Sequence, residues 1–79
     1  MKANVYVTLK QEVLDPQGDA VRRALHALGF GDVKGVRVGK LIELELEGDS
    51  AEAVREELEA MCQKLLANPV IEDFKFEVG

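Results

Sequence analysis

Cysteine is nearly absent from this sequence, since Cys62 is the only one among 79 residues. A single cysteine excludes an internal disulfide and a zinc site built from cysteines. Cys62 falls in a helical pattern beside Met61 and has no catalytic-looking partner, so we expect a small core residue rather than a reactive thiol. The lack of a disulfide framework predicts a cytoplasmic location.

Long hydrophobic runs and an excess of basic charge are also missing. No apolar segment approaches the roughly 18 residues that cross a bilayer, and the chain enters a strand pattern at once, without a signal peptide. Ten basic residues stand against fifteen acidic ones, a net charge of -5, and the few aromatic residues form no platform for stacking bases. We therefore expect neither a membrane nor a nucleic acid as partner.

The stretch from Val36 to Glu47 dominates what is present. Its aliphatic residues recur mostly at even positions and its charged residues mostly at odd ones, which is typical of a half-buried β-strand. The even set is Val36, Val38, Ile42, Leu44 and Leu46, interrupted by Lys40. A hairpin turning at Gly39-Lys40 is the alternative, but it would place Val36 opposite Glu43. The pattern favours one continuous strand that bends at Gly39.

A strand of twelve to fourteen residues spans about 40–46 Å. A compact domain of this size is only about 30 Å across. One end of the strand is therefore expected to leave its own subunit and to pair with a second chain. Self-association is also expected because so small a domain buries little surface alone, and disulfides and zinc are excluded.

The flanking segments predict a single domain, residues 1–79, of the α+β class with the order β-α-β-α-β. Alternation from Ala3 to Leu9 predicts the first strand, and alternation within 70–78 predicts the last. Asp15-Pro16 and Asp49 or Ser50 are expected to begin the two helices, and Gly29 and Asn68-Pro69 to end them. We expect both helices to cover one face of a sheet that has a long bent central strand and extends across a dimer.

No catalytic, cofactor-binding or metal-binding residues are expected on this chain. A phosphate site at the start of the first helix would lack the usual glycines and lysine, and Asp15 and Asp19 would repel the ligand. His26 has no ligating neighbours at suitable spacing and is interpreted as a surface residue. Gly18 is unusual in a first helical turn, where glycine costs about 1 kcal/mol relative to alanine, so a close backbone approach is one explanation and simple tolerance the other.

Three motifs together resemble the PurS family, the small subunits of phosphoribosylformylglycinamidine synthase. They are Leu14-Asp-Pro-Gln-Gly18, Val36-Arg-Val-Gly-Lys40 leading into Ile42-Glu-Leu44, and Leu65-Leu-Ala-Asn-Pro-Val-Ile-Glu72. The resemblance runs from about residue 4 to residue 78 in the right order and spacing. It implies a non-catalytic adaptor of an ATP-dependent amidoligase, with ATP and Mg used by another subunit.

The resemblance also implies the partners. The small subunit joins a glutaminase and a large synthetase, so that ammonia from glutamine reaches formylglycinamide ribonucleotide in purine (IMP) biosynthesis, and it forms a homo-dimer or tetramer. We expect the partner interface to draw on the motifs and on Lys40, whose ammonium is costly to bury unpaired. The candidate residues are Asp15, Pro16, Gln17, Gly18, Arg37, Gly39, Lys40, Asn68 and Pro69.

Two other functions remain open at this point. A stand-alone dimeric module that senses a small metabolite could build its site from the glycine-bearing loops. An enzyme in its own right is the third possibility. Co-elution with a glutaminase and a synthetase would favour the adaptor, whereas tight binding of a metabolite by the isolated chain would favour the sensor.

Overall fold

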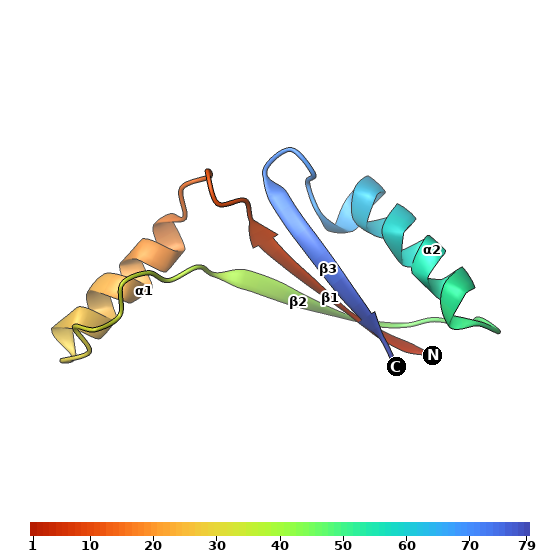
Figure 1. Cartoon of the computed structure of the whole chain (residues 1–79), viewed down its shortest axis with the longest axis horizontal. Coiled ribbons are helices and arrows are strands. Elements are labelled where there is room, and N and C mark those ends of the chain that lie inside the picture. Colours follow the sequence, from red (N-terminus) through yellow and green to blue (C-terminus); the bar gives the residue numbers. More distant parts are fainter.

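A computed structural model describes all residues, 1–79, as three strands and two main helices (Figure 1). The elements are β1 (Lys2–Leu9), α1 (Pro16–Ala27), β2 (Gly39–Glu45), α2 (Ala51–Met61), a π-helical turn η1 (Cys62–Leu66) and β3 (Glu72–Val78). The strands form one antiparallel sheet in the order β2-β1-β3. The predicted α+β class and the order β-α-β-α-β are confirmed.

β1 is the centre of the sheet because its alternating small aliphatic residues face the core. Ala3, Val5 and Val7 are buried, and the residues between them face the other side of the sheet. In register, Val5 lies between Ile42 of β2 and Phe76 of β3. This face of the sheet therefore presents one continuous apolar surface.

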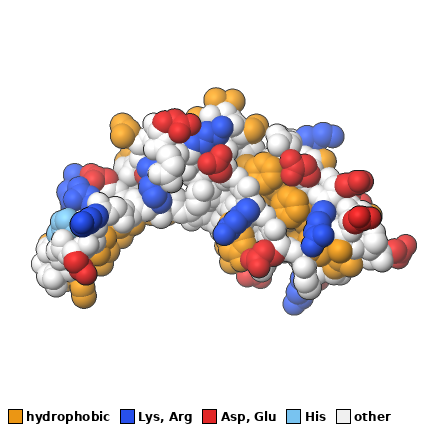
Figure 2. All heavy atoms as spheres, viewed as in Figure 1, with side chains coloured by type: hydrophobic (Ala, Val, Ile, Leu, Met, Phe, Trp, Pro, Cys, Tyr) orange, Lys and Arg blue, Asp and Glu red, His pale blue; other side chains and the backbone are white.

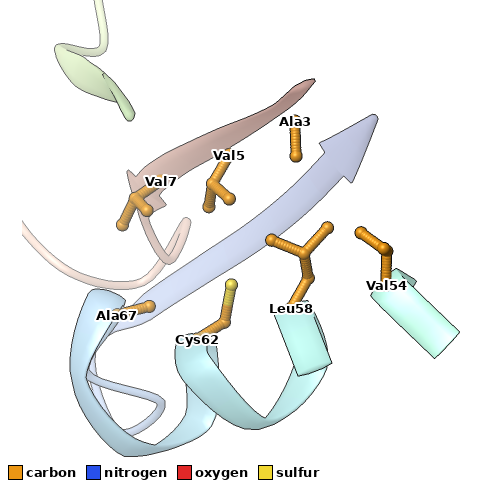
Figure 3. Packing of buried hydrophobic residues seen from close by; sticks show 7 residues of the cluster. All are labelled: Ala3, Val5, Val7, Val54, Leu58, Cys62 and Ala67. Carbon is orange, nitrogen blue, oxygen red and sulfur yellow. The ribbon is translucent and has the colours of Figure 1, made fainter. Parts of the chain in front are cut away.

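α2 covers part of that apolar surface. Ser50 begins the helix, because its hydroxyl accepts a hydrogen bond from the Ala53 amide at 3.2 Å. Val54 and Leu58 of α2 and Cys62 of η1 point towards β1, as Figure 3 shows. η1 ends the helix with a wide turn in which the Ala67 amide donates to the Cys62 carbonyl at 3.1 Å. The expectation that Cys62 is a buried core residue is thereby met.

β2 is shorter than the sequence predicts, and it lies at an edge of the sheet rather than at its centre. The strand runs through Gly39 and Lys40 without turning, so the hairpin alternative is wrong, but it pairs with β1 only from Gly39 to Glu45. Residues 36–38 are outside the strand, since the ladder with β1 ends at the pair Thr8 and Gly39 and the Val38 amide bonds to Asp15 instead. Ile42, Leu44 and Leu46 are half-buried on the core side, in agreement with the even-numbered pattern.

α1 does not cover the sheet, and the expectation of two helices on one face is wrong in this respect. The helix projects beyond the end of the sheet and residues 28–38 return beside it, so that the chain measures 50 × 25 × 14 Å (Figure 1). We call residues 16–38 the arm. The cause is local: the beginning of α1 is bonded to residues 36–38, which already lie past the last ladder pair of β1 and β2.

Candidate functional site

Asp15 joins the arm to the sheet. It is the N-cap of α1, and its Oδ1 accepts a hydrogen bond from the Gly18 amide at 2.9 Å. Its Oδ2 accepts a second from the Val38 amide at 2.7 Å. These backbone donors, Gly18 first and Val38 second, lower the pKa of Asp15 below its ordinary value. One carboxylate therefore caps the helix and also holds the returning chain just before β2 begins.

Gly18 explains how closely the helix and the returning chain approach each other. A Cβ atom at this position would overlap the carbonyl oxygen of Val36 and would lie 2.9 Å from Oδ2 of Asp15. Because the obstructing atom belongs to the backbone, it cannot move aside as a flexible side chain could. The close approach of the backbone offered as one explanation for Gly18 is confirmed.

Arg37 secures the segment that leads from β1 into the arm. Its Nη2 donates to the carbonyl oxygens of Lys10 at 2.6 Å and Val13 at 2.9 Å. The positive charge also contributes to the lowered pKa of Asp15. We call Asp15, Gly18, Arg37 and Val38 the arm root.

Two open hollows flank the arm root. The larger, of about 510 Å³, lies between the start of α1 and the returning chain, and its polar lining includes Arg22, Lys34 and Arg37. The smaller, of about 270 Å³, is lined in part by Gln17, Gly39, Lys40 and Glu72. Lys40 is exposed there, so its ammonium is not buried on the apolar face of β2.

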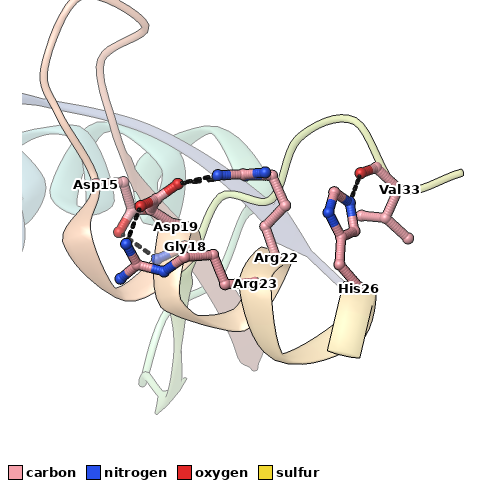
Figure 4. Close-up of polar contacts among 7 residues, drawn as sticks. All are labelled: Asp15, Gly18, Asp19, Arg22, Arg23, His26 and Val33. Carbon is pink, nitrogen blue, oxygen red and sulfur yellow. Dashed lines mark hydrogen bonds and ion pairs between the residues drawn. The ribbon is translucent and has the colours of Figure 1, made fainter. Parts of the chain in front are cut away.

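Basic charge on α1 is largely matched within the helix. Asp19 accepts from Arg22 at 2.7 Å and pairs with Arg23 at 3.2 Å, as Figure 4 shows. The hydrogen bond from Arg22 is the main cause of a lowered pKa for Asp19. Further along the arm, Nε2 of His26 lies 2.6 Å from the carbonyl oxygen of Val33 and links the helix to the returning chain. These contacts hold the arm together rather than presenting a cluster of free cations.

The turn before β3 is built around Asn68. Its side-chain oxygen accepts a hydrogen bond from the Val70 backbone amide at 3.1 Å. The backbone amide of Asn68 donates to Oε1 of Glu72 at 2.7 Å. The Lys10 amide donates to the carbonyl of Ile71 at 2.9 Å, so this turn is fastened to the end of β1. Glu72 brings the turn to the smaller hollow beside Lys40.

Most of the candidate interface residues gather at this end of the sheet. Asp15, Pro16 and Arg37 line the larger hollow; Asp15, Gln17, Gly39 and Lys40 line the smaller one. Gly18 lies against the carbonyl oxygen of Val36. Asn68 and Pro69 lie outside both hollows, in the neighbouring turn. The same turns expose two aliphatic residues that the sequence analysis did not name individually as interface candidates, Leu14 at 87% and Val70 at 78%. The signal for them in the sequence is an aliphatic residue within an otherwise polar turn.

The polar groups of the arm root are bonded to the backbone of their own chain, so their chemical effect is to fix the direction of the arm. No group of three or more His, Cys, Asp or Glu residues is arranged to hold a metal ion. None of the helices has the length and apolar character needed to cross a bilayer. The fold and this site define a small α+β protein made of an open three-stranded sheet and a projecting arm.

Comparisons with known proteins identify the family. The model of the family described as PurS, phosphoribosylformylglycinamidine (FGAM) synthase, matches residues 2–79. The chain is 51% identical to phosphoribosylformylglycinamidine synthase subunit PurS of Methanocaldococcus jannaschii over 98% of this chain and 93% of the relative. It is 50% identical to the same subunit of Bacillus subtilis, over 98% and 90%. This chain belongs to the PurS family.

Solved structures agree with the fold over nearly its whole length. The crystal structure of Methanocaldococcus jannaschii PurS superposes with a TM-score of 0.89 at 49% identity and covers 99% of this chain and 94% of that one. A chain in the structure of PurLQS from Thermotoga maritima gives a TM-score of 0.88 at 34% identity, over 96% and 93%. At this identity and coverage, the family relation extends over the whole described fold.

Proposed function

We propose that this chain is the non-catalytic small subunit of a phosphoribosylformylglycinamidine synthase. It bridges a glutaminase and an ATP-dependent synthetase so that ammonia from glutamine reaches formylglycinamide ribonucleotide in purine (IMP) biosynthesis. The observation that supports this most is the full-length likeness to a chain of the PurLQS assembly. In this proposal ATP and Mg are bound by the synthetase, no cofactor is bound by this chain, and the complex works in the cytoplasm.

The arm root and its neighbouring turns form the partner interface in this proposal. The surface comprises Asp15, Pro16, Gln17, Gly18, Arg37, Gly39, Lys40, Asn68 and Pro69. The exposed aliphatic side chains of Leu14 and Val70 support it, because apolar anchors beside polar groups are typical of protein interfaces. The internal bonds of Asp15 and Arg37 pre-form the surface, which reduces the ordering cost of binding.

The subunit is further proposed to act as a homo-dimer or tetramer. Only nine of its 79 residues are buried in the single chain, a small core for a domain that folds alone. The radius of gyration of 15.9 Å also exceeds the roughly 12 Å expected of a compact domain of this length. A second copy would cover some of the exposed apolar side chains. Residues 34–38 are the segment able to extend the sheet across the dimer.

A metabolite-sensing module is the alternative, favoured only by the two hollows at the arm root. One reconstitution separates the two functions. The synthetase and glutaminase are mixed with or without this chain, and product formation is measured from glutamine and, separately, from ammonium chloride. The adaptor predicts that glutamine-dependent synthesis requires the chain while ammonium-dependent synthesis needs it less. Equal glutamine-dependent rates without the chain would overturn the adaptor function.

A further inference from the structure

The sheet has an outer face, on the side opposite α2, that nothing in the chain covers. It is formed by the residues that alternate with the buried ones, and all of them except half-buried Tyr6 are exposed. Antiparallel sheets often leave one face to water, and such a face is then polar. Leu41 departs from this pattern, because it lies on the outer face opposite Tyr6 and is 51% exposed. Leu41 and Tyr6 therefore form an apolar centre on an otherwise polar face.

A row of acidic side chains lies beside this centre. Glu43 of β2 and Glu77 of β3 are both opposite Asn4 in the strand register, in the row next to that of Leu41 and Tyr6. Because neighbouring strands are about 4.8 Å apart, the backbones of the two glutamates are about 10 Å apart across β1. Both ion pairs of the structure are in α1, so neither glutamate has a cationic partner in the chain. A cation held over Asn4 would be within reach of both carboxylates.

Tyr6 already has a cation beside its ring. Nζ of Lys75 lies 5.2 Å from the centroid of the ring, within the range of a cation–π interaction. Lys75 comes from β3, whereas Leu41 flanks Tyr6 from β2. An arginine from another protein could lay its aliphatic part along Leu41 and Tyr6 and place its planar guanidinium between the two glutamates.

Charge is divided unevenly between the arm and the rest of the chain, which we call the body. The arm has four basic and two acidic residues, whereas the body has six basic and thirteen acidic ones. Figure 2 shows the histidine and basic side chains on the arm, and acidic side chains gathered at the far end of the body. This distribution favours a basic partner for the body and disfavours a second copy placed face to face with it, because the two acidic rows would repel each other.

We propose that the outer face of the sheet binds a basic segment of the synthetase, in which an arginine lies along Leu41 and Tyr6 and pairs with Glu43 and Glu77. This inference rests on the proposed adaptor function and gives it a second surface, since a bridge between two proteins needs two. The charge favours the synthetase over the glutaminase. Its substrates ATP and formylglycinamide ribonucleotide carry phosphate groups, which proteins bind with cationic side chains, whereas glutamine has no net charge.

Two variants test the apolar centre and the acidic row separately. Leu41→Ser removes the exposed apolar side chain, and Glu43→Lys reverses one charge of the row. Both residues are exposed, so each variant is expected to keep the fold. Each should weaken binding of the synthetase about tenfold, as expected for the loss of an apolar anchor or of a close charge pair. Glu43→Lys should also make binding less sensitive to salt, because the contact that it removes is electrostatic.

Leu41→Ile and Glu56→Lys are the matched controls. The first keeps an apolar side chain of the same volume, and the second makes the same charge reversal on the exposed side of α2. Both should bind the synthetase as the original chain does. Isothermal titration calorimetry measures the dissociation constants for the synthetase and, separately, for the glutaminase, whose binding should be unchanged in all four variants. Circular dichroism checks the fold, and Glu43→Lys suffices for the test if Leu41→Ser does not fold.

Three outcomes would overturn the proposal. Binding of the synthetase as tight in Leu41→Ser and Glu43→Lys as in the controls would show that the outer face only meets water. Weaker binding of the glutaminase alone would assign the face to the other partner. A change in the sedimentation of the isolated chain would assign it to a second copy. In all three cases the adaptor function still stands if glutamine-dependent synthesis requires the chain, whereas an original chain that binds neither protein would overturn the adaptor function itself.

Discussion

Gly18 and Val36 are in backbone contact, and there is no space between them for a side chain on residue 18. The contact joins the first turn of α1 to the chain that returns towards β2. Together with the bond from the Val38 amide to Asp15, it sets the angle at which the arm leaves the sheet. The shape of the subunit, and hence what it offers to partners, depends on these few atoms.

Gly18→Ala should therefore force the first turn of α1 away from the returning chain at Val36. Its Cβ overlaps a backbone oxygen, and relieving such overpacking costs typically about 1–3 kcal/mol. We expect a lower free energy of unfolding in urea and faster hydrogen exchange at the Val38 amide, whose acceptor is displaced.

Gly35→Ala is the matched control for this substitution. Gly35 lies in the same returning segment, but a Cβ there would meet nothing within 4 Å. Its effect on unfolding should be neutral or slightly stabilising, because alanine restricts the unfolded chain. Equal effects of the two substitutions would show that the Gly18–Val36 contact does not determine the stability of the arm.

Acid should loosen the arm root through Asp15. Its folded pKa is lowered by hydrogen bonds from Gly18 and Val38, so the ionised carboxylate is favoured by folding. The contribution is fully present above the unfolded pKa of about 4 and is lost as pH falls through the lower folded pKa. Chemical denaturation between pH 7 and pH 2 should show a loss of stability that begins below about pH 4.

Asp15→Asn should reduce this pH dependence. An asparagine side chain presents one NH2 group where the carboxylate accepted a second amide, so one of the two bonds to Gly18 and Val38 is lost at every pH. Asp32→Asn, in the exposed turn after α1, is the control and should leave the profile unchanged. A full acid transition in Asp15→Asn would assign the effect to other carboxylates, with Asp19 the first to test.

Local signals in the sequence predicted the elements well, and tertiary arrangement is where prediction failed. Asp15-Pro16, Gly29 and Ser50 mark helix ends by chemistry that acts within a few residues, and all three do so in the structure; Gly29 has a φ of 100°. Whether α1 covers its own sheet depends on contacts between residues that are distant in the sequence. An apolar stripe shows that a helix must be covered, but not which chain covers it.

The candidate site shows the same difference between local signals, which the sequence carries, and tertiary contacts, which it does not. Asp15 could be recognised as a helix cap, but its second bond, to Val38, depends on how the arm folds back and left no periodic signal. The strand pattern from Val36 to Leu46 correctly gave the side that faces the core. It overestimated the paired length, because alternation records which face a residue presents and not whether a neighbouring strand is there to pair with it.

Cys62 should be chemically inert in the folded protein. It is fully buried against β1, and burial, with a smaller effect of Glu59, raises the pKa of its thiol. A thiol reagent such as Ellman's reagent should label it only at the rate of unfolding. Cys62→Ser should cost about 1–3 kcal/mol, because it buries a hydroxyl without a prepared partner.

Exposed Gln63 provides the comparison for Cys62. Gln63→Ser changes the adjacent residue and should alter stability by less than about 0.5 kcal/mol. Rapid labelling of Cys62 under native conditions would contradict its burial. Glutamine hydrolysis by the purified chain that disappears in Cys62→Ser would contradict its assignment as a core residue.

Lys40 offers the sharpest test of the proposed partner interface. It is exposed beside Gln17 and Glu72 in the smaller hollow, although its register opposite Val7 places it on the apolar parity of β2. Lys40→Met removes the charge and keeps the bulk of the stem, so the free energy of unfolding should change by less than about 0.5 kcal/mol or rise slightly. Glutamine-dependent synthesis by the complex should fall at limiting subunit concentration, while synthesis from ammonium chloride continues.

The reason for this split is that only delivery of ammonia depends on docking, whereas the synthetase retains its own active site. Lys2→Met is the matched control, because Lys2 is also exposed but lies opposite Glu45 in the strand register, at the other end of the sheet. It should leave both activities unchanged. If Lys40→Met lowers the melting temperature by many degrees, Lys40 has a structural role. If the glutamine-dependent rate is the same in both variants, the partner surface does not include Lys40, and the docking assignment at the arm root is wrong.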